Sequence, residues 1–253
     1  MDPIQEYINL YNKNISISEI AKIYKIDRHR LSDILKANNI KIVNKRKRKY
    51  LPNHDYFENI DSEIKAYMLG FIFADGNVYK NRIKIEIRSY DKNILEIFSK
   101  EIYNYNLVKT ILKSDSEYAF INIFSEKMKN DLSKYSCVPN KSKILKFPNI
   151  LKEYYNHFIR GLIDGDGFIS YKSRTIGLLA TNDINLNIKN ILNEIGINSF
   201  IAKAYKQDIN VLNELRVKNK NSLNNLIDYL YKDATIYLER KYINAIEIKK
   251  MYV

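Results

Sequence analysis

A short apolar stretch that ends in acidic residues occurs twice in this sequence. The second copy, IRGLIDGDGFI, spans residues 159–169, and the first, MLGFIFADGNV, spans residues 68–78. Asp166 and Asp75 therefore align at an offset of 91 residues (166 − 75). The segments downstream of the two copies also correspond, because each half reads as a helix, two strands, a helix, two strands and a helix. A unit repeated at a fixed spacing predicts that one α+β fold is present twice in the chain.

Small residues share one face of each repeated helix at a spacing of four: Gly70 and Ala74 in the first copy, Gly161 and Gly165 in the second. Such a stripe lets two helix backbones cross closely. If the two helices pack together, Asp75 and Asp166 lie side by side at their ends. Two carboxylates so close are destabilised by mutual repulsion and by lost hydration. A divalent cation removes that cost, so the pair predicts a metal site.

The composition restricts the chemistry further. The 253 residues include 42 Lys and Arg against 29 Asp and Glu, a net charge of +13 that is typical of a polyanion-binding protein. Residues 1–50 hold 12 of the basic and 5 of the acidic residues, about half of the excess charge. One cysteine and three histidines cannot build a zinc cluster or a disulfide framework, so any metal must have oxygen ligands. Without an apolar span or a signal-like start, we expect a cytoplasmic chain that makes no membrane contact.

The first 44 residues predict a small all-α domain. Asp2-Pro3, the capping box SISE at residues 16–19, and Asp27 mark three helix starts. Three short helices with a tight turn before a basic third helix describe a helix-turn-helix, whose last helix enters the major groove. The predicted DNA-facing residues on that helix are Arg28, His29, Arg30, Ser32 and Lys36. The alternative is a small helical domain whose basic face is only solvated.

A basic linker is predicted at residues 45–56, because consecutive cations are followed by Pro52. Its expected DNA contacts, in the manner of basic arms, are Lys45, Arg46, Lys47 and Arg48. A solvated run of charges is the alternative.

The two motifs resemble those of the LAGLIDADG homing endonucleases, and their duplicated order resembles the single-chain, two-motif form of that family. The resemblance covers residues 57–253, including VPNKSKILKFPNI between the halves and IYLERKYINAIEI near the end. It implies a duplicated αββαββα core with pseudo-twofold symmetry, with halves at residues 57–150 and 151–253, and a monomer acting on double-stranded DNA.

The resemblance also implies roles for particular residues. The last acid of each motif, here Asp75 and Asp166, binds the catalytic metal, together with the backbone carbonyls of Ala74 and Gly165. Mg²⁺ is the expected ion, with Mn²⁺ as a substitute, since hard oxygen ligands suit both. Asp164 is expected to cap or orient the helix pair rather than to bind metal.

A basic residue on the fourth strand of a half, near the scissile phosphate, is a further implication, and Lys218 matches it. Phe124 takes the equivalent place in the first half, which leaves open whether both strands are cut equally. The alternation in RIKIEIRS, residues 82–89, predicts that Ile83, Ile85 and Ile87 face the core, while Lys84, Glu86 and Arg88 face DNA. Lys84, Arg88 and Arg216 are the predicted DNA contacts of the strands.

The leading interpretation is a metal-dependent, site-specific DNA endonuclease that makes a staggered double-strand break, with an added helix-turn-helix. A DNA-binding regulator on a catalytically weakened scaffold is the alternative from a non-enzyme class. An intron-splicing cofactor that binds RNA is a third reading.

Overall fold

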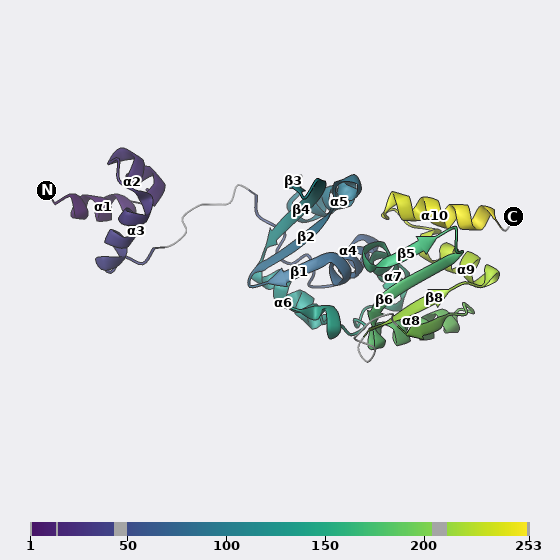
Figure 1. Cartoon of the computed structure of the whole chain (residues 1–253). Helices are drawn as coiled ribbons and strands as arrows, with labels where there is room; N and C mark the ends of the chain where they lie inside the picture. The colour runs from purple at the N-terminus through teal and green to yellow at the C-terminus, as the bar shows by residue number, and fades with distance from the viewer. Residues whose placement is uncertain (1, 14, 43–49, 204–211, 252–253) are drawn as a thin grey trace. The chain divides into compact units, whose positions relative to one another are not determined.

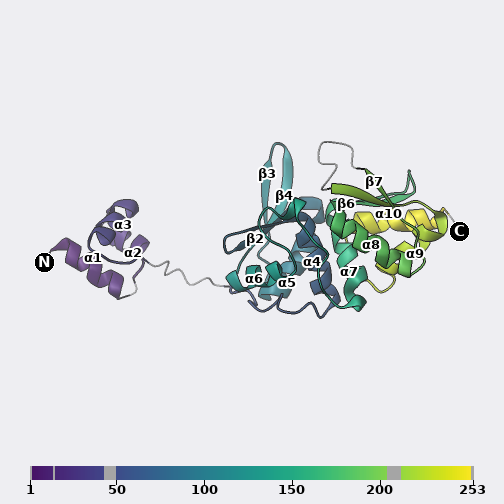
Figure 2. The same ribbon diagram turned by 90° about the horizontal axis from the view of Figure 1, so that it is seen from below.

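The computed structural model describes residues 2–13, 15–42, 50–203 and 212–251, and the chain divides into two compact units, residues 1–51 and 52–253. Within these described ranges, every helix is too short or too polar to cross a lipid bilayer. Figures 1 and 2 show the helices and strands of each unit.

The first unit consists of three helices: α1 (Pro3–Asn12), α2 (Ile17–Ile23) and α3 (Arg28–Ala37). Each starts at the cap that the sequence predicts. The carboxylate of Asp2 accepts from the backbone of α1, Ser16 and Glu19 cap each other at α2, and Asp27 accepts from two N–H groups of α3. The apolar faces meet in a small core made of Tyr11, Ile20, Ala21, Leu31 and Leu35. The three predicted helices are confirmed, and their DNA-binding role stays a prediction.

The second unit begins at Pro52, inside the range predicted as a linker. The N–H of Asn53 donates to the carbonyl of Ile102 at 2.8 Å, and the ring of Tyr56 is buried. Residues 52–56 therefore pack as part of the second unit. The basic residues Lys45, Arg46, Lys47 and Arg48 lie outside the described residues.

The second unit contains the predicted repeat. The elements of its first half are α4 (Glu63–Asp75), β1 (Gly76–Tyr79), β2 (Arg82–Arg88), α5 (Lys92–Tyr103), β3 (Lys109–Lys113), β4 (Ser116–Phe124) and α6 (Glu126–Lys134). Those of the second half are α7 (Tyr155–Asp166), β5 (Gly167–Ser170), β6 (Thr175–Thr181), α8 (Asn182–Glu194), β7 (Phe200–Lys203), β8 (Leu212–Val217) and α9 (Lys220–Tyr231). A last helix, α10 (Glu239–Lys250), follows the repeat. The order αββαββα is thus confirmed for both halves.

Each half forms a four-stranded antiparallel sheet, in the order β1-β2-β4-β3 in the first and β5-β6-β8-β7 in the second. The alternation predicted for β2 is confirmed, because Ile83, Ile85 and Ile87 are buried while the residues between them face outward. Helices α4 and α7 lie side by side between the two sheets (Figure 1).

A buried arginine in the middle of α7 connects the two central helices. The guanidinium of Arg160, on α7, is fully buried and contacts a carboxylate oxygen of Glu63, on α4, at 2.6 Å. It also donates to the carbonyls of Leu230 and Ile236 at 2.6 and 2.9 Å. A buried cation is tolerated only when it is paired and hydrogen-bonded, and these partners meet that condition. The arginine therefore ties both central helices to the C-terminal part of the chain.

Candidate active site

Glycines let the two central helices cross at backbone contact. A Cβ atom on Gly70 would lie 2.1 Å from the carbonyl oxygen of Phe158, and one on Gly161 would lie 2.1 Å from that of Tyr67. No side chain fits in such a space. Gly70 and Gly161 therefore stand where the backbones of α4 and α7 approach each other most closely. The same face continues to Gly165, where a Cβ would meet that of Ala74 at 2.2 Å.

The crossing brings the two aspartates together. Asp75 is the last residue of α4 and Asp166 is the last residue of α7, so both stand where the helix pair ends. The pKa of Asp75 is raised to about 6, mainly because the carboxyl loses hydration and secondly because the charge of Asp166 is near. Loss of hydration also raises the pKa of Asp166. Two distant parts of the sequence thus supply one pair of destabilised carboxylates.

Asp164, which the resemblance implies caps or orients the helix pair, is hydrogen-bonded to the other central helix. Its Oδ2 accepts from the hydroxyl of Tyr67, on α4, at 2.7 Å and from the N–H of Leu238 at 2.8 Å. Burial raises the pKa of this carboxyl to about 6. The matching residue of the first motif is Phe73, whose ring packs edge-on against Phe158 with centroids 5.2 Å apart. At this position of the two motifs, α7 therefore contacts α4 through a hydrogen bond from Tyr67 to Asp164, and α4 contacts α7 through the aromatic pair of Phe73 and Phe158.

Two buried lysines that sequence reasoning missed stand beside the aspartates. The Nζ of Lys141 donates to the carbonyl of Gly76 at 2.7 Å. The Nζ of Lys241 donates to the carbonyls of Ile163, Asp164 and Gly167 at 2.6 to 2.7 Å. Gly76 and Gly167 directly follow the two aspartates, so the lysines cap equivalent helix ends. Cations near a helix C-terminus stabilise its carbonyl groups.

The charges of both lysines act on the carboxylates, because each lowers the pKa of Asp75 and of Asp166. Burial in turn lowers the pKa of both lysines, that of Lys241 to about 8. The signal for them was present in the sequence: each lies in one of the two segments outside the motifs that carried the family resemblance.

Lys218, the basic residue predicted for the second half, is not one of these two buried lysines. Lys218 is exposed and follows the last residue of β8, beyond the ladder that pairs Ile176 with Val217. In the first half Ile83 pairs with Ile123, so Phe124 and Lys218 occupy matching positions, as the sequence alignment assumed. The catalytic role of Lys218 stays a prediction.

The predicted DNA contacts on β2 and β8 alternate with buried residues, so they lie on the face of each sheet that is turned away from the core. Arg88 is exposed and its guanidinium carbon lies 4.6 Å from the ring centre of Tyr118, while Lys84 pairs with Glu86 at 2.6 Å. Arg216 forms two hydrogen bonds to Glu214, at 2.7 and 2.8 Å. The charges of Lys84 and Arg216 are therefore partly neutralised by acidic neighbours, whereas Arg88 lies against an aromatic ring.

On the third helix of the first unit, the predicted contacts are also accessible. Arg28, His29, Arg30 and Lys36 are exposed, and Ser32 is half-buried.

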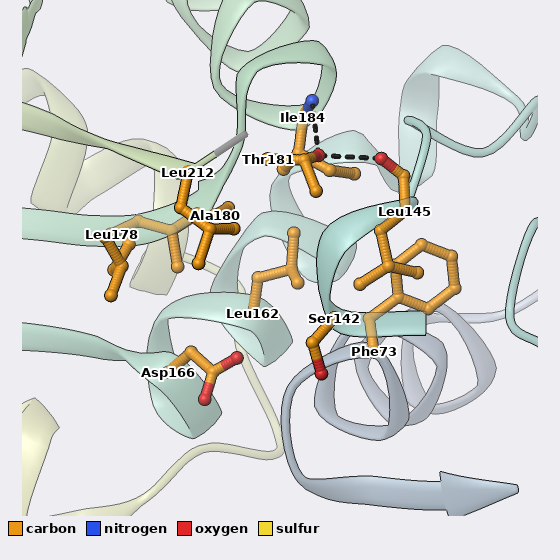
Figure 3. A pocket seen from close by; sticks show the side chains of 11 residues that line it. Phe73, Ser142, Leu145, Leu162, Asp166, Leu178, Ala180, Thr181, Ile184 and Leu212 are labelled. Carbon is orange, nitrogen blue, oxygen red and sulfur yellow. Dashed lines mark hydrogen bonds between the residues drawn. The ribbon is translucent and has the colours of Figure 1, made fainter. Parts of the chain in front are cut away.

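Two cavities flank the aspartate pair. One, of about 240 Å³, is lined by Asp75 and by residues of β2 and α10. The other, of about 150 Å³, is lined by Asp166 and by residues of β6, and Figure 3 looks into it. There, the hydroxyl of Thr181 donates to the carbonyl of Leu145 at 2.7 Å and accepts from the N–H of Ile184 at 3.4 Å. Each carboxylate thus has its own adjoining space.

The donor set fits a hard divalent cation. Two carboxylates from separate elements stand together, and both have raised pKa values that a cation would reverse. Among the residues that the structure describes, no group of three or more His, Cys, Asp and Glu side chains is positioned to hold a metal. Backbone carbonyls, such as those of Ala74 and Gly165, and water would have to complete the coordination of an ion held by these two acids.

Comparison with known proteins agrees with this architecture. Residues 153–230 match the LAGLIDADG-like domain family, and no curated protein sequence matches the chain. Two four-stranded antiparallel sheets around a central helix pair are the α+β fold of the LAGLIDADG endonucleases. The resemblance stated from the two motifs is therefore confirmed for the fold, and by sequence for residues 153–230.

Two solved structures illustrate the similarity. The I-LtrWI LAGLIDADG homing endonuclease bound to target DNA is 12% identical, with a TM-score of 0.50, and the match covers 79% of this chain and 90% of that one. The meganuclease I-SmaMI bound to uncleaveable DNA is also 12% identical with a TM-score of 0.50, covering 74% of this chain and 90% of that one. At this identity the likeness concerns the fold.

Proposed function

We propose that this chain is a divalent-metal-dependent DNA endonuclease that recognises a long site and cuts both strands. The observation that carries the proposal is the meeting of Asp75 and Asp166 where α4 and α7 end, between two sheets with exposed or half-buried cations. The fold is that of the LAGLIDADG endonucleases, and the two solved structures compared above contain DNA. The net charge of +13 suits the same polyanionic partner.

The residues have distinct roles in this proposal. Asp75 and Asp166, with the carbonyls of Ala74 and Gly165, hold Mg²⁺ or Mn²⁺. When bound, the ion neutralises phosphate charge and supplies an activated water for phosphodiester hydrolysis. Lys141 and Lys241 hold the two helix ends in place and partly offset the repulsion between the carboxylates. Lys218 is the proposed basic residue at the phosphate of the second half.

The first unit extends the contact with DNA. Its third helix presents Arg28, His29, Arg30 and Lys36 to solvent, and we propose that this helix enters the major groove as the recognition helix of a helix-turn-helix. A single chain with both halves needs no second copy to complete the aspartate pair. The proposed active form is therefore a monomer.

The test is selection of cleaved sites from a randomised duplex library in Mg²⁺, with Ca²⁺ as the non-cleaving control. Wild-type protein is expected to yield one enriched long site and a double-strand break within it. The variants Asp75→Asn and Asp166→Asn are expected to bind that site and to leave it uncut. Cleavage by either variant at the wild-type rate would overturn the metal-ligand assignment.

A second candidate function is a DNA-binding regulator on the same fold. Phe124 favours it, because a phenylalanine occupies the position that matches Lys218. Site-selective binding without cleavage in Mg²⁺ or Mn²⁺ would establish this alternative.

A further inference from the structure

The two cavities beside the aspartates occupy matching positions of the repeat. Gly76 pairs with Ile85 in the first half, and Gly167 pairs with Leu178 in the second. The offset from β2 to β6 is therefore 93 residues (178 − 85). It exceeds the offset of 91 between the motifs because the turn of the second hairpin is longer. Glu86 and Arg88, which line the cavity beside Asp75, then match Leu179 and Thr181, which line the cavity beside Asp166. The pair of cavities follows the duplication of the fold.

Their linings differ in charge. The cavity beside Asp75 is lined by the carboxyl groups of Asp75, Glu86, Asp91 and Asp164, by the cations of Arg88 and Arg240, and by two tyrosines. The cavity beside Asp166 is walled mostly by leucine, isoleucine, alanine and phenylalanine, and its lining includes neither Lys nor Arg (Figure 3). Only the first of these two cavities, as the structure describes them, offers a cation to an anionic ligand.

Arg240 is the cation that the duplication does not explain. It lies in the first turn of α10, directly before Lys241, whereas the residue before the matching Lys141 is the uncharged Asn140. The Nε of Arg240 donates to Oδ2 of Asp91 at 2.9 Å. Its guanidinium carbon lies 5.8 Å from the ring centre of Tyr90. The side chain is 49% exposed although it lines the cavity. A guanidinium has five N–H donors in a planar fork, and both of its contacts to Asp91 use Nε.

The charge of Arg240 reaches the metal-binding pair as well, since it lowers the pKa of Asp75. A planar cation next to a carboxylate and open to solvent has the geometry that binds a phosphodiester bidentately. Asp91 keeps this cation in place and at the same time competes with a phosphate for it.

We propose that Arg240 binds a DNA backbone phosphate in the cavity beside Asp75, and that the two strands are consequently held unequally at the two aspartates. This inference rests on the proposed function, because it needs a duplex across the aspartate pair. The phosphate on the Asp75 side is held by a cation that has no equivalent among the described residues that line the other cavity. That strand is the one cut first.

Phosphate-ethylation interference tests the contact without catalysis. A duplex selected for binding from a randomised library is ethylated, bound in Ca²⁺, separated into bound and free fractions, and mapped on each strand. Arg240→Ala is expected to abolish interference at one phosphate of one strand. It should also reduce the slope of log affinity against log salt concentration by about 1, because one phosphate contact is lost. Arg240→Lys is expected to retain that interference at a weaker level.

Asp91→Asn separates phosphate binding from a structural ion pair. If Asp91 competes with phosphate, this variant binds the duplex several-fold more tightly, whereas Arg240→Ala binds it more weakly. If the ion pair only holds α10 against the first half, both variants weaken binding alike and the proposal fails. Arg174→Ala, on the exposed hairpin turn of the second half, is the matched control and is expected to leave interference at that phosphate unchanged.

The outcomes also distinguish this inference from the proposed function. Absence of duplex binding by the wild type would overturn both. Wild-type binding with an interference map that Arg240→Ala leaves unchanged would overturn the Arg240 contact alone. In Mg²⁺, nicks accumulating first on the strand that carries the Arg240-dependent phosphate would support the order of cutting, and nicks first on the other strand would overturn that order.

Discussion

Gly70 and Gly161 are reciprocal partners across the central helix pair. Each stands against a backbone carbonyl of the opposite helix, Gly70 against that of Phe158 and Gly161 against that of Tyr67, and at each a Cβ would lie 2.1 Å from the oxygen. The distance from one helix to the other, and with it the meeting of the two aspartates, depends on the absence of these two side chains.

Gly161→Ala is expected to destabilise the second unit by about 3 kcal/mol or more, because a methyl group against backbone forces the helices apart. Equilibrium urea unfolding measures the loss. Gly196→Asn is the matched control, since Gly196 has φ +77° and open space around it, and asparagine tolerates that conformation. A variant Gly161→Ala as stable as the control would show that the helix pair is not close-packed.

Asp75→Asn is expected to stabilise the metal-free protein at pH 7.5. The folded-state pKa of Asp75 is raised from 3.8 to about 6, so wild-type stability falls as pH rises from about 4 to 6, as this carboxyl loses its proton. The variant lacks that loss. Its advantage is therefore roughly 1–3 kcal/mol above pH 6 and vanishes below pH 4. Urea unfolding in EDTA, once at pH 7.5 and once below pH 4, measures the difference in stability between the variant and the wild type.

Mg²⁺ should reverse this order, since the ion stabilises only the form that binds it. In Mg²⁺ the wild type is expected to gain stability and Asp75→Asn to gain little. If the variant is less stable than the wild type in EDTA at pH 7.5, the carboxylate is not strained by its neighbours.

Tyr67→Phe is expected to cost about 1–3 kcal/mol, because it removes a buried hydrogen bond to Oδ2 of Asp164 and leaves that oxygen less satisfied. Tyr135→Phe removes an exposed bond to the carbonyl of Glu58 and is expected to cost less than about 0.5 kcal/mol. Thermal unfolding of both variants gives the comparison. Equal effects would contradict the role of Asp164 in holding the helix pair.

Lys241→Met and Lys141→Met are expected to differ in severity. The first removes hydrogen bonds to three carbonyl groups at the end of α7, and the second removes the one to Gly76. The loss of stability is expected to be larger for Lys241→Met by about 1–2 kcal/mol. Urea unfolding at pH 7 in EDTA measures both, and the reverse order would contradict the assignment of Lys241 as the stronger helix cap.

Removal of residues 1–51 is expected to leave the second unit folded, because the chain divides at that point. The truncated chain should unfold at the same urea concentration as the second transition of the full chain. Its affinity for duplex DNA should fall and lose part of its salt dependence, since about half of the excess charge is removed. Unchanged affinity and salt dependence would exclude the first unit from DNA contact.

Much of the architecture could be predicted from local patterns. The repeat at an offset of 91 residues, the glycine stripe and the isoleucine alternation of β2 each depend on residues close together in sequence, so their periodicity revealed the helices, the strands and the helix crossing. The pairing of Asp75 with Asp166 could be predicted as well, because two glycine-lined helices with acids at the same position have one close arrangement.

Only the tertiary structure decided which groups surround that pair. Lys141, Lys241 and Arg240 lie outside both motifs, and only the folding of the connecting segments brings their side chains to the aspartates. The difference between the charged and the apolar cavity likewise depends on which side chains from several elements meet in one space. Periodicity in a sequence reports how one element faces its surroundings, whereas the electric field at a buried carboxylate is a sum over neighbours that only three-dimensional packing brings together.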